Sequence, residues 1–215
     1  MKTIKIKEKI LGKNDQLARE NKKVLQREKV LTINLLGSPG AGKTSLLQKI
    51  IDRIKDNYKI AVIEGDLYTA RDGKRLESYG IEVVQINTQG ACHLDASMVK
   101  KALQEINLKE IDLLIIENVG NLVCPASFDL GEDMKITVFS ITEGSDKLLK
   151  YPLIFARAKA VVINKIDLIA HTDYSASYLH SDLAKINKNL KIFELSSKTG
   201  IGVDKFCTYL EEKLR

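Results

Sequence analysis

The chain has 215 residues, of which 44% are hydrophobic, enough for the core of one medium-sized globular domain. Its formal net charge is +6, and the whole positive excess lies in residues 1–30, which hold ten Lys or Arg and four acidic residues. The rest of the chain holds 24 basic and 24 acidic residues. With no Trp and no broad basic face the chain is not expected to bind nucleic acid, and with no long apolar run it is not expected to bind or cross a membrane. The three cysteines are therefore expected to stay reduced in the cytoplasm.

The first segment, residues 1–30, is predicted to be a basic N-terminal extension, helical over Asp15–Lys29. Leu17, Val24 and Leu25 form a narrow apolar stripe on that helix. The stripe predicts packing against the rest of the chain or against a partner. Residues 31–215 are predicted to be a single nucleotide-binding domain.

A phosphate-binding loop follows the apolar run Leu31–Leu36. Residues 37–44 read G-S-P-G-A-G-K-T, which matches the pattern G-x-x-x-x-G-K-S/T and opens an amphipathic helix predicted over Lys43–Lys55. Backbone N–H groups and the helix N-terminus would bind the phosphates, Lys43 would reach the β and γ phosphates, and Thr44 would offer its hydroxyl to Mg²⁺. The residues predicted to bind here are Gly37, Gly40, Ala41, Gly42, Lys43, Thr44 and Ser45.

Carboxylates end two later strands, at Glu64-Gly65-Asp66 and at Glu117. Asp66 is predicted to coordinate Mg²⁺ directly or through water, and Glu117 to orient an attacking water or one bound to Mg²⁺. Lys43, Asp66 and Glu117 are thus the expected catalytic residues, and Gly120 is expected to offer its N–H to the γ phosphate. Asp72 is an alternative second carboxylate. No Gln or Arg can be assigned as the hydrolytic group, which favours slow intrinsic turnover.

Two thiols and an imidazole lie in loops predicted to share the sheet edge of the phosphate loop. Cys92 and His93 follow the third strand, and Cys124 comes seven residues after Glu117. Such ligands suit Ni²⁺ or Zn²⁺, and three per chain leave an open position or a site shared across a two-fold axis. An ordinary buried role is the alternative, since Cys often packs as a small hydrophobe. That role is expected for Cys207, and surface positions for His171 and His180.

A base-selecting motif appears near the end of the chain, where Asn164-Lys165-Ile166-Asp167 follows a strand. The Asp167 carboxylate can accept both the N1 and N2 hydrogens of guanine, whereas adenine offers no matching pair, so the motif predicts GTP and GDP as ligands. Asn164 is expected to brace the loop and Lys165 to lie along the ring. Ser196, Ser197 and Lys198 are expected to close the pocket.

The remaining pattern predicts the fold. Seven short apolar runs begin near residues 31, 60, 81, 113, 136, 160 and 192, and helices are predicted between most of them, including Asp95–Ile106, Asp173–Lys188 and Val203–Leu214. We therefore predict an α/β, three-layer P-loop NTPase fold with a mostly parallel central sheet of about seven strands.

Together these motifs resemble the hydrogenase nickel-incorporation GTPase family HypB, of the SIMIBI class of P-loop GTPases. The resemblance rests on residues 37–44, 64–66, 90–96, 117–125, 138–152 and 164–168. It implies a GTPase that binds nickel or zinc through Cys92, His93 and Cys124, forms a homodimer when loaded with GTP, and works with nickel-delivery proteins to insert nickel into the hydrogenase large subunit. The chain lacks the Cys-rich or His-rich N-terminal stretch of some members.

Three alternatives stay open at this level. A urease accessory GTPase is expected to carry Cys-Pro-His, whereas this chain has Cys-Pro-Ala at residues 124–126. A small-molecule P-loop kinase would have no use for the guanine-selecting motif. A signalling or targeting GTPase would work without bound metal.

Overall fold

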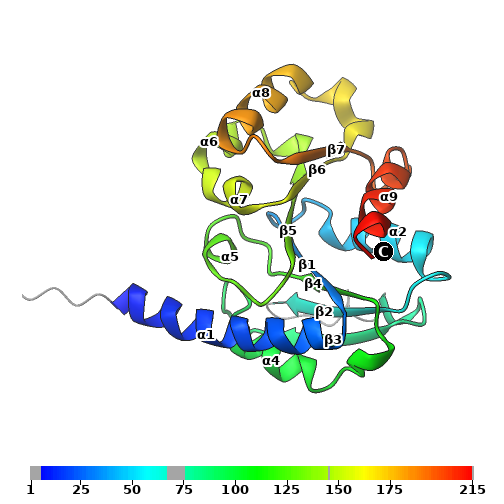
Figure 1. Cartoon of the computed structure of the whole chain (residues 1–215). Coiled ribbons are helices and arrows are strands. Elements are labelled where there is room, and N and C mark those ends of the chain that lie inside the picture. The colour runs from blue at the N-terminus through cyan, green and yellow to red at the C-terminus, as the bar shows by residue number, and fades with distance from the viewer. Residues whose placement is uncertain (1–5, 67–75, 145, 215) are drawn as a thin grey trace, which may run out of the picture.

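The computed structural model describes residues 6–66, 76–144 and 146–214, and its centre is one parallel sheet (Figure 1). Seven strands lie in the order β3-β2-β4-β1-β5-β6-β7, and every pairing between them is parallel. The predicted α/β P-loop architecture is therefore confirmed. The strands are β1 (Leu31–Leu36), β2 (Ile60–Asp66), β3 (Glu82–Asn87), β4 (Leu113–Glu117), β5 (Met134–Ser140), β6 (Ala160–Asn164) and β7 (Lys191–Glu194).

Helices cover both faces of this sheet and complete the three layers (Figure 1). One face carries α2 (Lys43–Ile54) and α9 (Val203–Leu214). The other carries α1 (Ile6–Arg27) and α4 (Ala96–Leu103) over β2 and β4, and α6 (Asp146–Lys150), α7 (Pro152–Arg157) and α8 (Ala176–Ile186) over β5 and β6. The short elements are α5 (Cys124–Ser127), η1 (Leu108–Glu110), η2 (Ile141–Glu143) and η3 (Ile166–His171).

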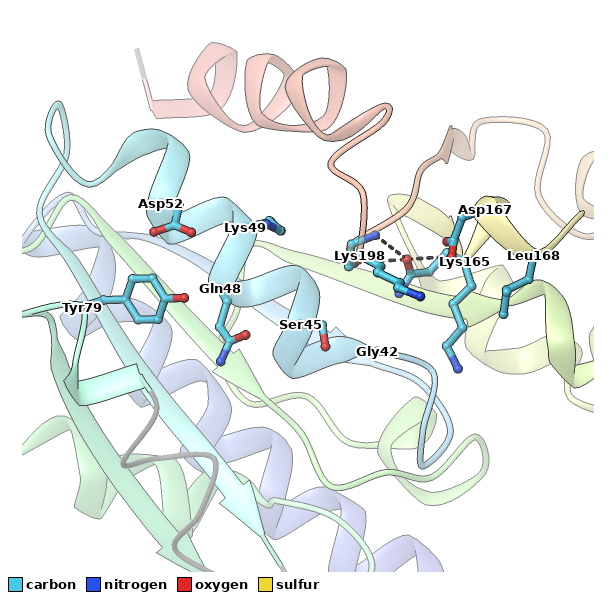
Figure 2. A pocket seen from close by; sticks show the side chains of 12 residues that line it. Gly42, Ser45, Gln48, Lys49, Asp52, Tyr79, Lys165, Asp167, Leu168 and Lys198 are labelled. Atoms are coloured by element: carbon cyan, nitrogen blue, oxygen red, sulfur yellow. Dashed lines mark hydrogen bonds between the residues drawn. The ribbon is translucent and has the colours of Figure 1, made fainter.

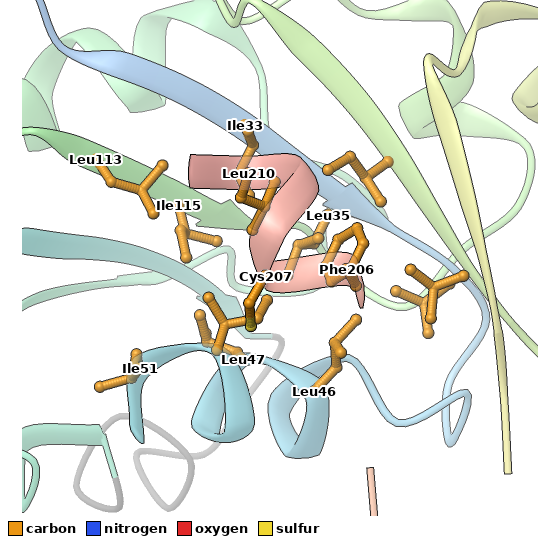
Figure 3. Close-up of a cluster of buried hydrophobic side chains, with 14 of the residues drawn as sticks. Ile33, Leu35, Leu46, Leu47, Ile51, Leu113, Ile115, Phe206, Cys207 and Leu210 are labelled. Carbon is orange, nitrogen blue, oxygen red and sulfur yellow. The ribbon is translucent and has the colours of Figure 1, made fainter. Parts of the chain in front are cut away.

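The largest core cluster lies between the sheet and the α2/α9 layer (Figure 3). Alternate residues of β1 and β4, such as Ile33 and Ile115, meet Leu47 of α2 and Phe206 of α9. Cys207 lies in the same cluster with 2% of its surface exposed, and burial raises the pKa of its thiol to about 12. The predicted core role of Cys207 is thus confirmed, and this thiol stays protonated at neutral pH.

The helix predicted in the extension packs on the domain through buried amides. The α1 side chains Leu25 and Ala18 are buried, and α1 lies alongside α4 (Figure 1). Asn21 Nδ2 donates to the carbonyls of Ala96 at 2.9 Å and of Leu130 at 3.0 Å. Asn14 Oδ1 accepts from the Ala96 N–H at 2.9 Å. These contacts join α1 to the start of α4, next to the loop that carries Cys92 and His93.

Two predicted helices are shorter than expected at their start. The helix predicted from Asp95 begins at Ala96, because the Asp95 carboxylate caps it and accepts from the N–H groups of Ser97 and Met98, both at 2.9 Å. The helix predicted from Asp173 begins at Ala176. None of the helices in the described ranges is both long and apolar enough to cross a membrane.

Candidate nucleotide pocket and metal centre

The phosphate loop runs from the carboxyl end of β1 into α2. Gly42 is the N-cap of α2 with φ 94°, a left-handed conformation that favours glycine, and a Cβ there would lie 2.3 Å from Asn164 Nδ2. Lys43 Nζ donates to the carbonyls of Gly37 at 3.3 Å and Ser38 at 3.2 Å. A cavity of about 550 Å³ opens over Gly40, Gly42, Lys43, Thr44 and Ser45, at the positive end of the helix dipole.

Three carboxylates line the same cavity. Thr44 Oγ1 donates to Glu117 Oε1 at 2.8 Å, and Asp66 lies at the end of β2. Glu64 is the register partner of Glu117 on the neighbouring strand, and both side chains are buried. Adjacent buried carboxylates with a hydroxyl form a donor set of hard oxygens, which fits Mg²⁺.

The sequence pattern does not single out Glu64 as a site residue. The available signal was an acidic residue inside an otherwise apolar strand, but only pairing with β4 shows that it lies beside Glu117. Asp72, the alternative second carboxylate, lies outside the described residues.

Gly120 lies directly against the phosphate loop. A Cβ at this position would come within 2.9 Å of the backbone N and Cα of Pro39, so the close approach requires glycine. Gly120 also lines the phosphate cavity. The loop after β4 therefore contacts the loop after β1 through backbone atoms.

The base-selecting motif forms a second cavity of about 510 Å³, which shares Gly42, Ser45 and Lys165 with the first (Figure 2). Asn164 braces it: Nδ2 donates to the Ala41 carbonyl at 3.0 Å, and Oδ1 accepts from the Ser197 N–H at 3.0 Å. Asp167 Oδ1 accepts from Ser196 Oγ at 2.5 Å. Asp167 and Lys198 both line this cavity.

Lys165 connects the two cavities. It adopts a left-handed conformation with φ 67°, and its Nζ donates to the Gly40 carbonyl at 2.6 Å. The aliphatic stem therefore runs from the base-selecting loop to the phosphate loop.

The ligand atoms of Cys92, His93 and Cys124 all lie within 4.8 Å of one another. Cys92 is exposed and Cys124 is partly buried at the start of α5. His93 Nδ1 lies 3.5 Å from Cys92 Sγ, and burial lowers the pKa of the imidazole while Asp95 partly offsets this. Thiolates with a neutral imidazole suit borderline-soft cations such as Ni²⁺ and Zn²⁺.

Residues that the sequence did not single out hold these ligands in place. The His93 ring contacts Phe128 with centroids 4.0 Å apart. Asn118 Oδ1 accepts from the Leu94 N–H at 3.1 Å, and Asn121 Nδ2 donates to the Cys92 carbonyl at 3.2 Å. Both asparagines come from the loop after β4. The sequence-predicted site residues thus gather at one edge of the sheet, as a nucleotide group and a Cys92/His93/Cys124 group that the loop after β4 joins. His171 and His180 lie outside both groups and are exposed.

Comparison with known proteins gives a consistent result. Residues 31–194 match the family model described as CobW/HypB/UreG, nucleotide-binding domain. The hydrogenase maturation factor HypB of Rhizobium leguminosarum bv. viciae is 45% identical over 97% of this chain and 70% of its own length. The hydrogenase/urease maturation factor HypB of Helicobacter pylori J99 is 45% identical over 100% of this chain and 89% of its own length. A crystal structure of HypB from Helicobacter pylori in complex with nickel superposes with a TM-score of 0.90 at 43% identity, covering 94% of this chain and 95% of that one.

Proposed function

The chain belongs to the HypB hydrogenase maturation factors of the CobW/HypB/UreG family, and from this premise we propose that it is a GTP-hydrolysing metallochaperone for nickel insertion into nickel-iron hydrogenase. One observation carries the proposal. Cys92, His93 and Cys124 converge on a soft-metal site, and the loop that supplies Cys124 also lines the phosphate cavity. A nucleotide switch and a nickel-binding site therefore lie on adjoining loops.

Guanine selection argues against a small-molecule kinase. The Asp167 carboxylate lies in the base cavity, held by Ser196, where it can accept two hydrogens from guanine. A urease accessory GTPase is not favoured either, because the relatives of about 45% identity carry the HypB name. In addition, this chain has Ala126 at the position where a urease accessory GTPase is expected to have the His of its Cys-Pro-His motif. The cluster of three candidate ligands, Cys92, His93 and Cys124, argues against a signalling GTPase that works without bound metal.

Hydrolysis would depend on positioning and charge. Lys43 would exchange its contacts with loop carbonyls for the β and γ phosphate oxygens, and the α2 N-terminus would add positive potential. Thr44, Asp66, Glu117 and the neighbouring Glu64 fit Mg²⁺, which would supply positive charge at the phosphates. Glu117 would accept a hydrogen bond from the attacking water. The described residues that line this cavity include neither Arg nor Gln, which supports slow intrinsic turnover.

Nickel is the cargo of this chaperone and not a resident cofactor. Three ligands per chain leave coordination positions open for a second subunit or a recipient protein. Such open positions are what a metal needs in order to be passed on. We accordingly propose a GTP-dependent homodimer that contacts nickel-delivery proteins and the hydrogenase large subunit. Zn²⁺ would compete for the same ligands. Because the site needs free thiols, we place the protein in the reducing cytoplasm.

Two measurements on one preparation test the proposal. Phosphate release is expected with GTP and not with ATP, and nickel titration is expected to show thiolate-to-nickel absorption. Cys124→Ser should reduce the absorption, since only the Cys92 thiolate remains, and should weaken nickel binding at least tenfold, because a hydroxyl is a poor ligand for this metal.

Cys207→Ser is the matched control, since it removes a thiol that lies in the hydrophobic core away from the site. It should keep nickel binding, and both variants should keep guanine-nucleotide affinity. Equal nickel binding by Cys124→Ser and the wild type would contradict the proposed metal site.

A further inference from the structure

Asn121 contacts the phosphate loop through its backbone. Its N–H donates to the Gly37 carbonyl at 3.0 Å, and the two residues form an isolated antiparallel bridge outside the sheet. The same Gly37 carbonyl accepts from Lys43 Nζ at 3.3 Å. One carbonyl oxygen is therefore shared by the lysine that faces the phosphates and by the backbone of Asn121.

The side chain of Asn121 contacts both thiol-bearing segments. Nδ2 donates to the carbonyl of Cys92 at 3.2 Å, and Oδ1 accepts from the N–H of Val123, the residue before Cys124, at 2.8 Å. The amide thus joins the two backbone segments that carry Cys92 and Cys124. Gly120, the preceding residue, packs on Pro39 of the phosphate loop.

We propose that Asn121 is the positioning residue through which phosphate occupancy sets the geometry of the Cys92/Cys124 metal site. This inference rests on the proposed function and assigns the coupling between nucleotide binding and nickel binding to the side-chain amide of Asn121. Phosphate oxygens are stronger acceptors for an ammonium group than a peptide carbonyl is. When Lys43 turns to a phosphate, the Gly37 carbonyl loses the hydrogen bond from Lys43 Nζ and keeps the one from the Asn121 N–H. A shift of the Gly37 peptide then moves Asn121. Through its side-chain hydrogen bonds, Asn121 moves the segments that carry Cys92 and Cys124.

The test compares nickel dissociation constants of the full chain loaded with GDP and with a nonhydrolysable GTP analogue. The ratio of the two constants is the readout, and couplings of this kind give about 5- to 150-fold differences. Asn121→Asp keeps an acceptor for the Val123 N–H but replaces the donor to Cys92 with a second acceptor. Its added charge also acts on the bound cation, so its ratio is compared with that of an uncharged variant. Asn121→Ala removes both contacts without adding charge.

Asn187 offers a matched control at the opposite edge of the sheet. Its Oδ1 accepts from the Asn189 N–H at 3.1 Å, and its Nδ2 donates to the Ala158 carbonyl at 3.0 Å and, less closely, to those of Phe155 and Ala156, so it makes the same two kinds of contact as Asn121. Asn187→Asp and Asn187→Ala should keep the wild-type ratio. Thermal melting of all four variants shows that each is folded under the assay conditions.

Both Asn121 variants are expected to bring the ratio close to one while guanine-nucleotide affinity without metal changes less than about threefold. By reciprocity, the effect of nickel on the affinity for the GTP analogue relative to GDP must shrink by the same factor. Asn121 variants that keep the wild-type ratio, or a wild-type ratio of one with nickel bound in both states, would overturn this inference and leave the proposed function standing. A wild type that binds no nickel would overturn both.

Discussion

At the residue scale, a few side chains do more than one task because parallel strands bring several loops to one edge. Asn164 holds the phosphate loop through Ala41 and the closing loop through Ser197. Asp167 is held by Ser196 and lines the base cavity. The proposed selection of guanine would therefore depend on one carboxylate whose orientation is held by a hydrogen bond from Ser196.

Asp167→Asn should weaken GTP binding at least tenfold, because hydrogen bonds to a charged acceptor contribute about 1.5–3 kcal/mol and the amide keeps only one acceptor oxygen. The new amide N–H₂ can donate to the 2-carbonyl of xanthine, so xanthosine triphosphate should bind more tightly to the variant than to the wild type. Competition against a fluorescent guanine nucleotide measures both. A variant that binds GTP as the wild type does would place the base elsewhere.

At the element scale, α1 is joined to the sheet by a chain of buried polar contacts. Asn34 of β1 donates to Glu132 Oε1 at 3.2 Å, and Glu132 Oε2 accepts from the Leu130 N–H at 2.7 Å. The Leu130 carbonyl accepts from Asn21 of α1. Burial raises the pKa of Glu132, and Lys135, 3.5 Å away, partly offsets the effect. The loop after α5 therefore carries a titratable group inside the contact between α1 and the sheet.

Glu132→Gln should change how stability depends on pH. Since the folded pKa of Glu132 is raised above its unfolded value, its contribution to stability is complete below about pH 4.3 and is lost as the pH rises through the folded pKa. The free energy of unfolding of the wild type relative to Glu132→Gln should therefore be smaller at pH 7 than at pH 4. Urea unfolding at both pH values measures the difference. Parallel pH profiles of the two proteins would contradict the assignment.

At the scale of the whole molecule, the phosphate cavity and the Cys92/His93/Cys124 cluster lie on adjoining loops, and the metal site proposed for this cluster has too few ligands for a closed coordination shell. Cys92 is exposed, and Val123 beside Cys124 has 56% of its surface exposed. The described cluster supplies three ligands, one fewer than a closed tetrahedral site needs. In the proposed homodimer, a second copy that presents the same residues across a two-fold axis would complete the coordination.

Light scattering should therefore detect a change of mass with nucleotide. The GDP-loaded protein should scatter as a 24.1 kDa monomer, and the protein loaded with a nonhydrolysable GTP analogue and nickel should approach twice that mass. Cys92→Ser should weaken the nickel-dependent part of this association, because one of the three proposed ligands is lost. A mass that is independent of both nucleotide and nickel would contradict the shared site.

The sequence by itself determined the sheet, the phosphate loop and the guanine motif, because each is encoded by contiguous residues whose spacing follows from backbone geometry. The seven strands, the β1–loop–α2 unit and the core position of Cys207 all followed from local pattern. The family resemblance also rested on contiguous motifs, and comparison confirmed it.

Only the tertiary structure decided which distant residues meet. Glu64 joins Glu117 through strand register, Asn14 and Asn21 attach α1 to the start of α4, and Asn121 bridges Gly37 and Cys92. These partners are separated by tens of residues, and an asparagine or glutamate has the same local pattern whether it faces solvent or a buried carbonyl. Hydrogen-bond partners across a sheet depend on strand order, which local spacing does not specify.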